Sequence, residues 1–393
     1  MSKEIVIVDG CRSPIGGFGG AFKDMMPSDL AVHVINTLME RTGVEKVQVE
    51  EIILGHCIQR TDDVNTARVV SVKAGFPKET TGVTVQRQCS SAMQAIVQGY
   101  HELFAGDVEM VVAGGVEIMS SSPYLLKKAR WGQRLQHGEM SDTVWEVLTD
   151  PVMKIIMGET AENLAEKYSI TREEQDQVSL RSHQNAVDAT KKGRFKDEIV
   201  PIQIPRGKKA PLLVERDEHP REDISMETLA ALKPVFRKGG TVTPGNSSGI
   251  NDGAAAVLMT TEKRARSMGL KPLGRIVSYA WAGVEPELMG YGPVPAVKKA
   301  LQRAGLTLGD IELIEVNEAF AAQYLACEKL LGLNRDIVNV NGSGVGLGHP
   351  VGCTGTRIVV TLLHEMKRRQ LKRGLASLCV GGGMGMAMVL ERD

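Results

Sequence analysis

Three reactive side chains of this sequence, Cys89, His349 and Cys379, stand at the edges of turns rich in glycine or other small residues. Cys89 follows an extended β-branched segment at residues 83–85 and precedes a small-residue helix start. The first N–H groups of a helix are unpaired and its dipole is positive at that end, which favours a thiolate, the nucleophilic form of cysteine. Two thiols and an imidazole can together form an acyl-enzyme and move protons.

Each of these residues also has an ordinary structural interpretation. A free cysteine is usually a small buried hydrophobe, and Cys379 lies between Leu378 and Val380 in a pattern typical of a buried strand. Asn317 follows another strand pattern, where its side chain can cap the next helix or hold a water. The occurrence of a histidine and two cysteines in three turns of this kind favours chemistry over packing.

Several other classes of function are excluded. The glycines of residues 342–348 lack the spacing of a dinucleotide or phosphate loop. Lys plus Arg equals Asp plus Glu at 47 each, so no strong field attracts nucleic acid or an anionic membrane. The six cysteines show no CxxC or zinc spacing, so we expect reduced thiols and no metal site; four of them are interpreted as structural, namely Cys11, Cys57, Cys327 and Cys353.

The apolar segments predict a soluble protein of the cytoplasm. Residues 1–9 lack the long apolar region of a secretory signal, and about 18 consecutive apolar residues occur nowhere in the chain. At 393 residues, the chain is long enough for two or three packed units.

The elements that position the reactive residues recur along the chain. Strand patterns cover residues 4–9, 51–57 and 108–113, and helical spacing covers residues 28–43, 66–74 and the segment after Cys89. Residues 51–55 correspond to residues 312–316, an offset of 261, and residues 112–115 to residues 379–382, an offset of 267. In this interpretation Gly114 and Gly115 close a strand, as the glycines after Cys379 do.

An insertion interrupts the first copy of this repeat. The second copy continues directly into residues 386–390, whereas the matching residues 254–259 come only after about residue 249. We therefore predict an N-terminal domain of residues 1–119 with 250–272, a loop domain of residues 120–249, and a C-terminal domain of residues 273–393. Long insertions on rigid scaffolds usually carry binding function, and alternating strands and helices predict mixed sheets covered by helices.

The motifs around Cys89, residues 315–320, His349 and Cys379 resemble the thiolase family, and the resemblance begins at residues 5–16 and covers almost the whole chain. It implies an α/β thiolase fold, in which two similar α/β domains form a five-layered αβαβα arrangement under an inserted loop domain. It also implies that Cys89 is acylated, that His349 takes its proton, and that Cys379 exchanges the α-proton of acetyl-CoA.

The resemblance further implies two oxyanion holes, one formed by the N–H groups of Cys89 and Gly381 and one by His349 with a water held by Asn317. For coenzyme A it implies Arg221 at the adenine end and Ser248 at the pantetheine. The channel and acyl pocket would be lined by Met157, Phe236, Met289, Ala319 and Phe320. Met157 and Phe236 are equally consistent with ordinary core residues.

The implied partners are acetyl-CoA, acyl-CoA and CoA, with no metal and no cofactor beyond this substrate. The resemblance also implies a homodimer or homotetramer. Residues 130–140 are either the loop that joins dimers into a tetramer or a plain solvent-exposed loop.

The predicted function is acetyl-CoA C-acetyltransferase, the reversible formation of acetoacetyl-CoA through a Cys89 thioester. One alternative is a 3-ketoacyl-CoA thiolase for longer chains in fatty-acid β-oxidation, which is supported by Ile156 and by Ser90 and Ser91. Ile156 stands where acetoacetyl-CoA-specific members often have histidine, and Gln86 and residues 343–346 also depart from the commoner residues of the family, so the chain-length preference stays open. Another is a non-catalytic CoA-binding scaffold subunit, against which the intact set of reactive residues argues. A condensing enzyme that uses acyl-carrier protein fits less well, because such enzymes generally use two histidines, or a histidine and an asparagine, where this chain has Asn317, His349 and Cys379.

Overall fold

The computed structural model describes residues 3–392, so the predicted domain ends at residues 1, 2 and 393 lie outside the described residues. Across this range, ten strands form one sheet in the order β12-β13-β14-β11-β1-β10-β5-β3-β4, with β2 paired to β10. Its strands are β1 (Ile5–Arg12), β2 (Gly16–Gly17), β3 (Glu51–Gly55), β4 (Thr81–Val85), β5 (Met110–Ile118), β10 (Asn251–Thr261), β11 (Gly274–Gly283), β12 (Leu313–Val316), β13 (Arg373–Val380) and β14 (Met384–Glu391).

Two halves of the sheet have the same construction. In the N-terminal half β3 is parallel to β5, which is antiparallel to β10. In the C-terminal half β12 is parallel to β13, which is antiparallel to β14. The halves meet where β1 pairs with β11, through Val6 opposite Arg275 and Ile7 opposite Gly274. The predicted duplication is therefore present in the strand order.

The register of the strands corrects one part of the predicted repeat. Ile52 lies opposite Val112, and Leu313, its counterpart, lies opposite Gly374. Val112 is therefore equivalent to Gly374, and the predicted equivalence of residues 112–115 with 379–382 is wrong by five residues. Gly114 does not close a strand: it lies inside β5, where a Cβ atom would collide with the carbonyl oxygen of Ala255 on β10.

Three layers of helices sandwich the two halves of the sheet. Apolar side chains of α3 and α12 form a core with the inner faces of both halves. The outer face of the N-terminal half packs on α1 and α2, and that of the C-terminal half on α9 and α10. The predicted five layers are thereby confirmed. These helices are α1 (Pro27–Thr42), α2 (Thr66–Lys73), α3 (Ser91–Ala105), α9 (Pro293–Ala304), α10 (Ala321–Leu331) and α12 (Thr354–Arg369).

The central helix α12 shows why the sequence forms this middle layer. Its residues 354–366 are all buried, which is typical of a helix packed on every side rather than along one stripe. The basic residues that follow, Lys367, Arg368 and Arg369, lie in its last turn, where they complement the negative end of the helix dipole.

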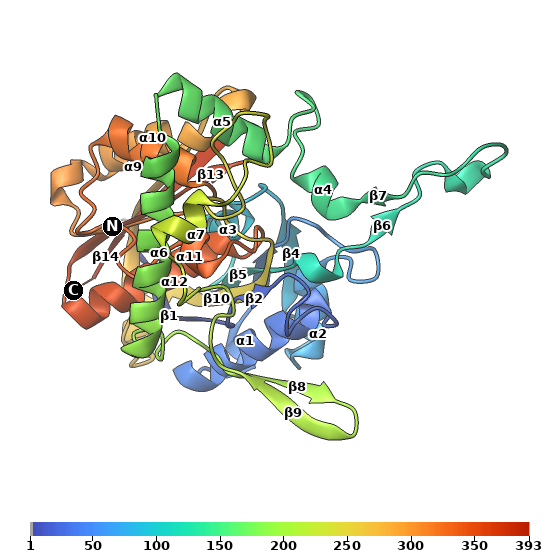
Figure 1. Cartoon of the computed structure of the whole chain (residues 1–393). Coiled ribbons are helices and arrows are strands. Elements are labelled where there is room, and N and C mark those ends of the chain that lie inside the picture. Colours follow the sequence, from blue (N-terminus) through green and yellow to red (C-terminus); the bar gives the residue numbers. More distant parts are fainter. Residues whose placement is uncertain (1–2, 393) are drawn as a thin grey trace.

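The inserted segment after β5 covers the C-terminal half and also extends away from the body. Its helices α5 (Met157–Lys167) and α6 (Arg172–Lys191) lie on the layered body, and a capping box of Thr171 and Glu174 begins α6. Figure 1 shows two projections: an arm that carries β6 (Tyr124–Leu125) and β7 (Ser141–Asp142), and a hairpin of β8 (Ile202–Arg206) and β9 (Lys209–Val214). Between residues 3 and 392, no helix is both long and apolar enough to span a bilayer.

Candidate active site

A strained turn between β4 and α3 presents Cys89. Gln88, directly before it, has φ of 45°, a left-handed conformation that is uncommon for a residue other than glycine. The Ser91 hydroxyl accepts the N–H of Arg87 at 2.8 Å and donates to the carbonyl of Gln88 at 2.6 Å, which holds the turn closed. Cys89 is consequently only partly buried and stands two residues before the helix start, as predicted.

The electrostatics of Cys89 differ from the sequence-based expectation. Burial raises the pKa of its thiol above the usual range. The backbone N–H groups of Gly381 and of Cys89 act in the opposite direction and lower the pKa, but desolvation is the larger effect. In the resting site burial therefore outweighs the effect expected of the helix start, because burial depends on packing that the local pattern does not contain. The resting thiol needs a base to remove its proton.

His349 has the hydrogen bonding that such a base requires. Its Nδ1 lies 2.7 Å from the hydroxyl oxygen of Thr354, which donates its own proton to the carbonyl of Pro350 at 2.9 Å. The hydroxyl can therefore only accept from the imidazole, which assigns the proton to Nδ1 and the lone pair to Nε2. His349 Nε2 is buried and has no hydrogen-bond partner among residues 3–392.

The charge state of His349 agrees with this role. Burial, followed by the positive charge of Arg357, lowers the pKa of His349 to about 3. The imidazole is therefore neutral at physiological pH, with a free lone pair in a site largely closed to water.

Cys379 lies at the end of β13 and shares this site with Cys89. It is fully buried, and burial raises the pKa of its thiol well above the usual range, with the Cys89 thiolate as the second cause. The backbone gives the same result: a Cβ atom on Gly381, two residues after Cys379, would lie 3.7 Å from the side chain of Gln88, directly before Cys89. The turn after β13 therefore adjoins the turn that carries Cys89. Beyond Cys379 the backbone turns through Gly382 and Gly383, whose φ values of 80° and 76° require glycine.

Asn317 lies just after β12 with its whole side chain buried. Its backbone N–H donates to the carbonyl of Ser377 at 2.9 Å, which holds it beside β13. Neither atom of its side-chain amide has a partner within the described part of the chain. Burying an unpaired amide is costly, so a water or a substrate oxygen is the natural partner for it.

An apolar cluster surrounds Cys379 and contains most of the predicted acyl-pocket residues. Met157, Met289, Ala319 and Phe320 belong to it and are buried. Phe236 packs against them, with its ring 6.1 Å from that of Phe320 in an edge-to-face arrangement. These side chains therefore belong to the same core cluster as Cys379.

The two residues predicted to hold coenzyme A differ in their exposure. Arg221 is exposed and lines a pocket of about 180 Å³ with His183 and His219. Ser248 is partly buried, and its N–H donates to the carbonyl of Ala319 at 2.9 Å. Ser248 thus adjoins the apolar cluster, and Arg221 lies at an open pocket.

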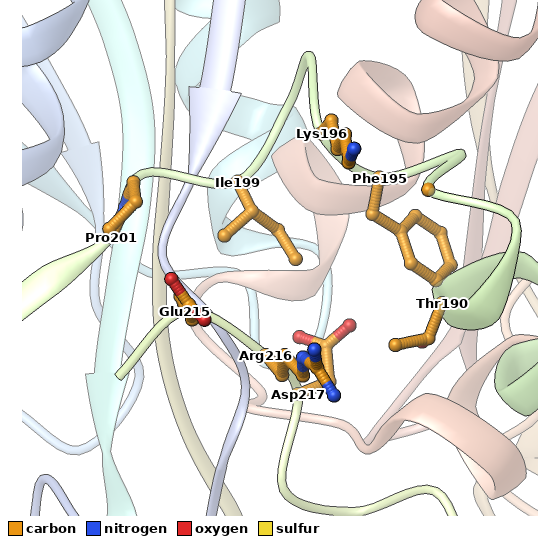
Figure 2. Close-up of a pocket in the computed structure, with 9 residues that line it drawn as sticks. Thr190, Phe195, Lys196, Ile199, Pro201, Glu215, Arg216 and Asp217 are labelled. Atoms are coloured by element: carbon orange, nitrogen blue, oxygen red, sulfur yellow. The ribbon is translucent and has the colours of Figure 1, made fainter. Parts of the chain in front are cut away.

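A larger hollow, of about 260 Å³, lies elsewhere (Figure 2). Its lining comes from the last turn of α6 and from the chain that follows it as far as Asp217, including Phe195, Lys196 and Arg216, and includes none of the predicted site residues.

Sequence reasoning missed three residues that adjoin the reactive groups. Cys57 packs in the same small cluster as Cys89, Glu117 is a buried carboxylate on β5, and Asn251 accepts the backbone N–H of His349 at 3.0 Å. The signal for Glu117 and Asn251 was present, since each is a polar residue in or next to a long apolar run. The signal for Cys57 was weak, because it follows its strand without a distinctive motif.

Comparisons with known proteins match this chain to thiolases over almost its whole length. Profiles described as "Thiolase, N-terminal domain" and "Thiolase, C-terminal domain" match residues 5–263 and 270–392. The chain is 47% identical over 396 residues to the acetyl-CoA acetyltransferase of Syntrophomonas wolfei, covering 100% of both.

Solved structures support the same assignment. The crystal structure of the Bacillus anthracis acetyl-CoA acetyltransferase matches with a TM-score of 0.98 at 59% identity, covering 99% of each chain. Human mitochondrial 3-ketoacyl-CoA thiolase in complex with CoA matches with a TM-score of 0.96 at 41% identity, covering 100% of this chain and 98% of that chain. The predicted fold is confirmed, and the chain belongs to the thiolase family.

Proposed function

We propose that the protein is an acetyl-CoA acetyltransferase that joins two molecules of acetyl-CoA into acetoacetyl-CoA and CoA, and catalyses the reverse cleavage. This proposal is supported by the interaction between Cys89 and Cys379, by the packing of Cys89 against a cluster that contains Val351 of the His349 loop, and by the buried Nε2 of neutral His349, which has no partner among the described residues. The test is cleavage of acetoacetyl-CoA by CoA with the purified chain. A CoA-binding scaffold would give no acetyl-CoA in this assay.

The first half-reaction transfers an acetyl group to Cys89. His349 Nε2 takes the thiol proton, the sulfur attacks the thioester carbonyl of acetyl-CoA, and the C–S bond to CoA breaks. The proton on His349 then goes to the departing CoA thiolate. The N–H groups of Cys89 and Gly381 lower the pKa of the Cys89 thiol, and this supports their role as the donors to the oxyanion that develops on the attacked carbonyl.

The second half-reaction forms the carbon–carbon bond. His349 Nε2 takes the proton of the Cys379 thiol, and the Cys379 thiolate then removes a proton from the methyl group of a second acetyl-CoA. The resulting carbanion attacks the acetyl group on Cys89. The bond to the Cys89 sulfur breaks, acetoacetyl-CoA leaves, and His349 returns its proton to the Cys89 sulfur. The enolate oxygen accepts a hydrogen bond from Nε2 of His349, which now carries the proton taken from Cys379, and one from a water that bonds to the buried amide of Asn317; that amide has no partner in the described chain.

The three predicted parts of the chain divide this work. Residues 1–119 with 250–272 supply Cys89, and residues 273–393 supply Asn317, His349 and Cys379. Residues 120–249 bind CoA through Arg221 and Ser248. Arg221 is exposed, and Ser248 contacts Ala319. These positions support a bound CoA whose adenine lies near Arg221 at the surface and whose acyl end lies beyond Ser248. Balanced charge and thiols expected to be reduced support a place in the cytoplasm.

Replacing Asn317 with alanine should lower turnover much more than stability. Loss of one oxyanion donor typically costs about 2.7 to 4 kcal/mol of transition-state stabilisation, which is roughly 10²- to 10³-fold in kcat. The native amide has no protein partner to lose, so the melting temperature should change little. Steady-state kinetics and thermal unfolding of the same preparation check this, and near-normal turnover would remove Asn317 from the site.

Substrate length separates the proposed activity from its alternative. The acyl wall is closed, with Met157 and Met289 exposed by only 7% and 2%. We therefore expect kcat/KM for cleavage to be highest for the four-carbon 3-ketoacyl-CoA and to fall steadily toward sixteen carbons. A maximum at longer chains would instead assign the protein to fatty-acid β-oxidation, in line with Ile156.

The projecting arm is proposed to join copies of this chain. Residues 130–140 lie on it, and Trp131, Leu135 and Met140 are 90%, 84% and 68% exposed. Large apolar side chains so exposed usually mark an interface. The double variant Trp131→Ser with Leu135→Ser should convert a tetramer into a dimer in sedimentation velocity. An unchanged sedimentation coefficient would leave the arm as a solvent-exposed loop.

A further inference from the structure

The loop that carries the base, residues 348–352 between α11 (Gly344–Leu347) and α12, is held through its backbone by side chains of the opposite half. Asn251, at the start of β10, accepts the N–H of His349 on Oδ1 at 3.0 Å. Glu117, on β5, accepts the N–H of Gly352 on Oε2 at 3.0 Å. Both acceptors are fully buried, so water does not compete for these bonds.

The two glycines that flank His349 make these contacts possible. A Cβ atom on Gly348 would lie 2.7 Å from Asn251 Oδ1, and one on Gly352 would lie 2.5 Å from Glu117 Oε2. Gly348 also has φ of 102°, which other residues rarely adopt. Each glycine therefore lets a side chain from the N-terminal half approach the backbone of the base loop.

The orientation of the Asn251 amide is itself fixed. Its Nδ2 donates to the carbonyl of Gly16 at 3.0 Å and lies 3.4 Å from His219 Nδ1. His219 Nε2 must carry a proton, because it bonds to the carbonyl of Val345 at 3.0 Å, and burial lowers the pKa of His219 to about 4. Neutral His219 thus has an acceptor at Nδ1, which leaves Asn251 Oδ1 directed at His349.

Glu117 connects the same loop to Cys57 and Ile58, which pack near the nucleophile. Its carboxylate also accepts the N–H groups of Cys57 at 3.0 Å and Ile58 at 3.2 Å, and His56 Nε2 lies 3.3 Å from it. Cys57 and Ile58 pack in the small cluster that includes Cys89. A displacement of Glu117 would therefore move the base loop relative to Cys57 and Ile58, and so relative to Cys89.

We propose that Asn251 and Glu117 are positioning residues that fix His349 Nε2 against the sulfur of Cys89. They act through the backbone of the base loop and touch neither substrate nor reacting atoms. This inference rests on the proposed function. It adds an explanation of how a base from one half of the chain is held at a fixed position relative to a nucleophile from the other half.

A double-mutant cycle with the full chain tests the proposal. The rate constant for acetylation of Cys89 by acetyl-CoA is measured by quenched intact mass in Asn251→Ala, His349→Ala, the double variant and the unmodified protein. Misplacing a catalytic group by about 1 Å costs on the order of 10²-fold. We therefore expect a loss of that order from Asn251→Ala when His349 is present, and a loss below about twofold when it is absent.

Thr260→Val is the matched control. Thr260 is fully buried at the far end of β10, and its hydroxyl donates to the carbonyl of Glu109, directly before β5. This variant loses a side-chain bond between β10, which carries Asn251, and the residue directly before β5, which carries Glu117. The melting temperature of the protein should therefore fall. Its acetylation rate constant should stay within about twofold of the unmodified value, because sites this distant are independent.

The outcomes separate the proposal from a general structural role. Equal losses from Asn251→Ala with and without His349, or no loss at all, would overturn it. Should Asn251→Ala not fold, Glu117→Gln enters the same cycle, since an amide keeps only one acceptor oxygen for three N–H groups, and the same non-additivity is expected. Absence of an acetyl adduct on the unmodified protein would instead count against the proposed function.

Discussion

Replacing Cys89 with alanine should abolish both cleavage and synthesis of acetoacetyl-CoA. Removal of the nucleophile from a covalent enzyme typically lowers kcat by roughly six orders of magnitude. The side chain is only partly buried and its turn is held by Ser91 and the backbone of Arg87 and Gln88, so the variant should fold normally. Turnover is measured by the consumption of acetoacetyl-CoA, and folding by circular dichroism.

Cys11→Ala is the matched control for that experiment. Cys11 is fully buried in β1, and its thiol donates to the carbonyl of Val34, remote from the reactive residues. This variant should lose stability and retain turnover. The opposite result, turnover retained in Cys89→Ala and lost in Cys11→Ala, would show that Cys89 is not the nucleophile.

Replacing Cys379 with alanine should separate the two half-reactions. Cys89 should still accept an acetyl group from acetyl-CoA, because Cys89, His349 and the N–H of Gly381 remain. Condensation should fall by about 10²- to 10⁴-fold, the usual contribution of a positioned base. Exchange of the acetyl-CoA methyl protons with deuterium in heavy water should fall with it. Proton NMR of the methyl signal follows this exchange.

The neighbouring Cys327 provides the control for Cys379. It is equally buried and belongs to the C-terminal half, and its thiol donates to the carbonyl of Gly290. Cys327→Ala should retain methyl-proton exchange. If Cys379→Ala lost acetylation and exchange to the same degree, Cys379 would support the site as a whole rather than act as the base of the second step.

The reactive residues were predictable because their signals are local. Each signal depends only on residues that are close in the sequence. Cys89 stands between a β-branched strand and a small-residue helix start, and His349 stands between a glycine and a proline. The five layers were predictable from the resemblance of several such motifs in a fixed order. The structure places each of these residues at the turn or strand end that its motif indicates.

Contacts between distant segments were not predictable from the sequence. Glu117 and Asn251 acquire their partners only when β5 and β10 meet the base loop. The raised pKa of Cys89 results from burial by residues far along the chain, which outweighs the local helix effect. Gly114 looked like part of a turn, whereas its lack of a side chain serves a close approach to β10 within the sheet.

The most direct test of the account is to mix the unmodified protein with acetyl-CoA, quench with acid, and locate any adduct by intact mass and peptide mapping. We expect one acetyl group per chain, carried by the peptide that contains Cys89 and removed when CoA is added. An acetyl group on Cys379 instead, or none on any cysteine, would contradict the claim that Cys89 is the nucleophile of a site shared by both halves of the chain.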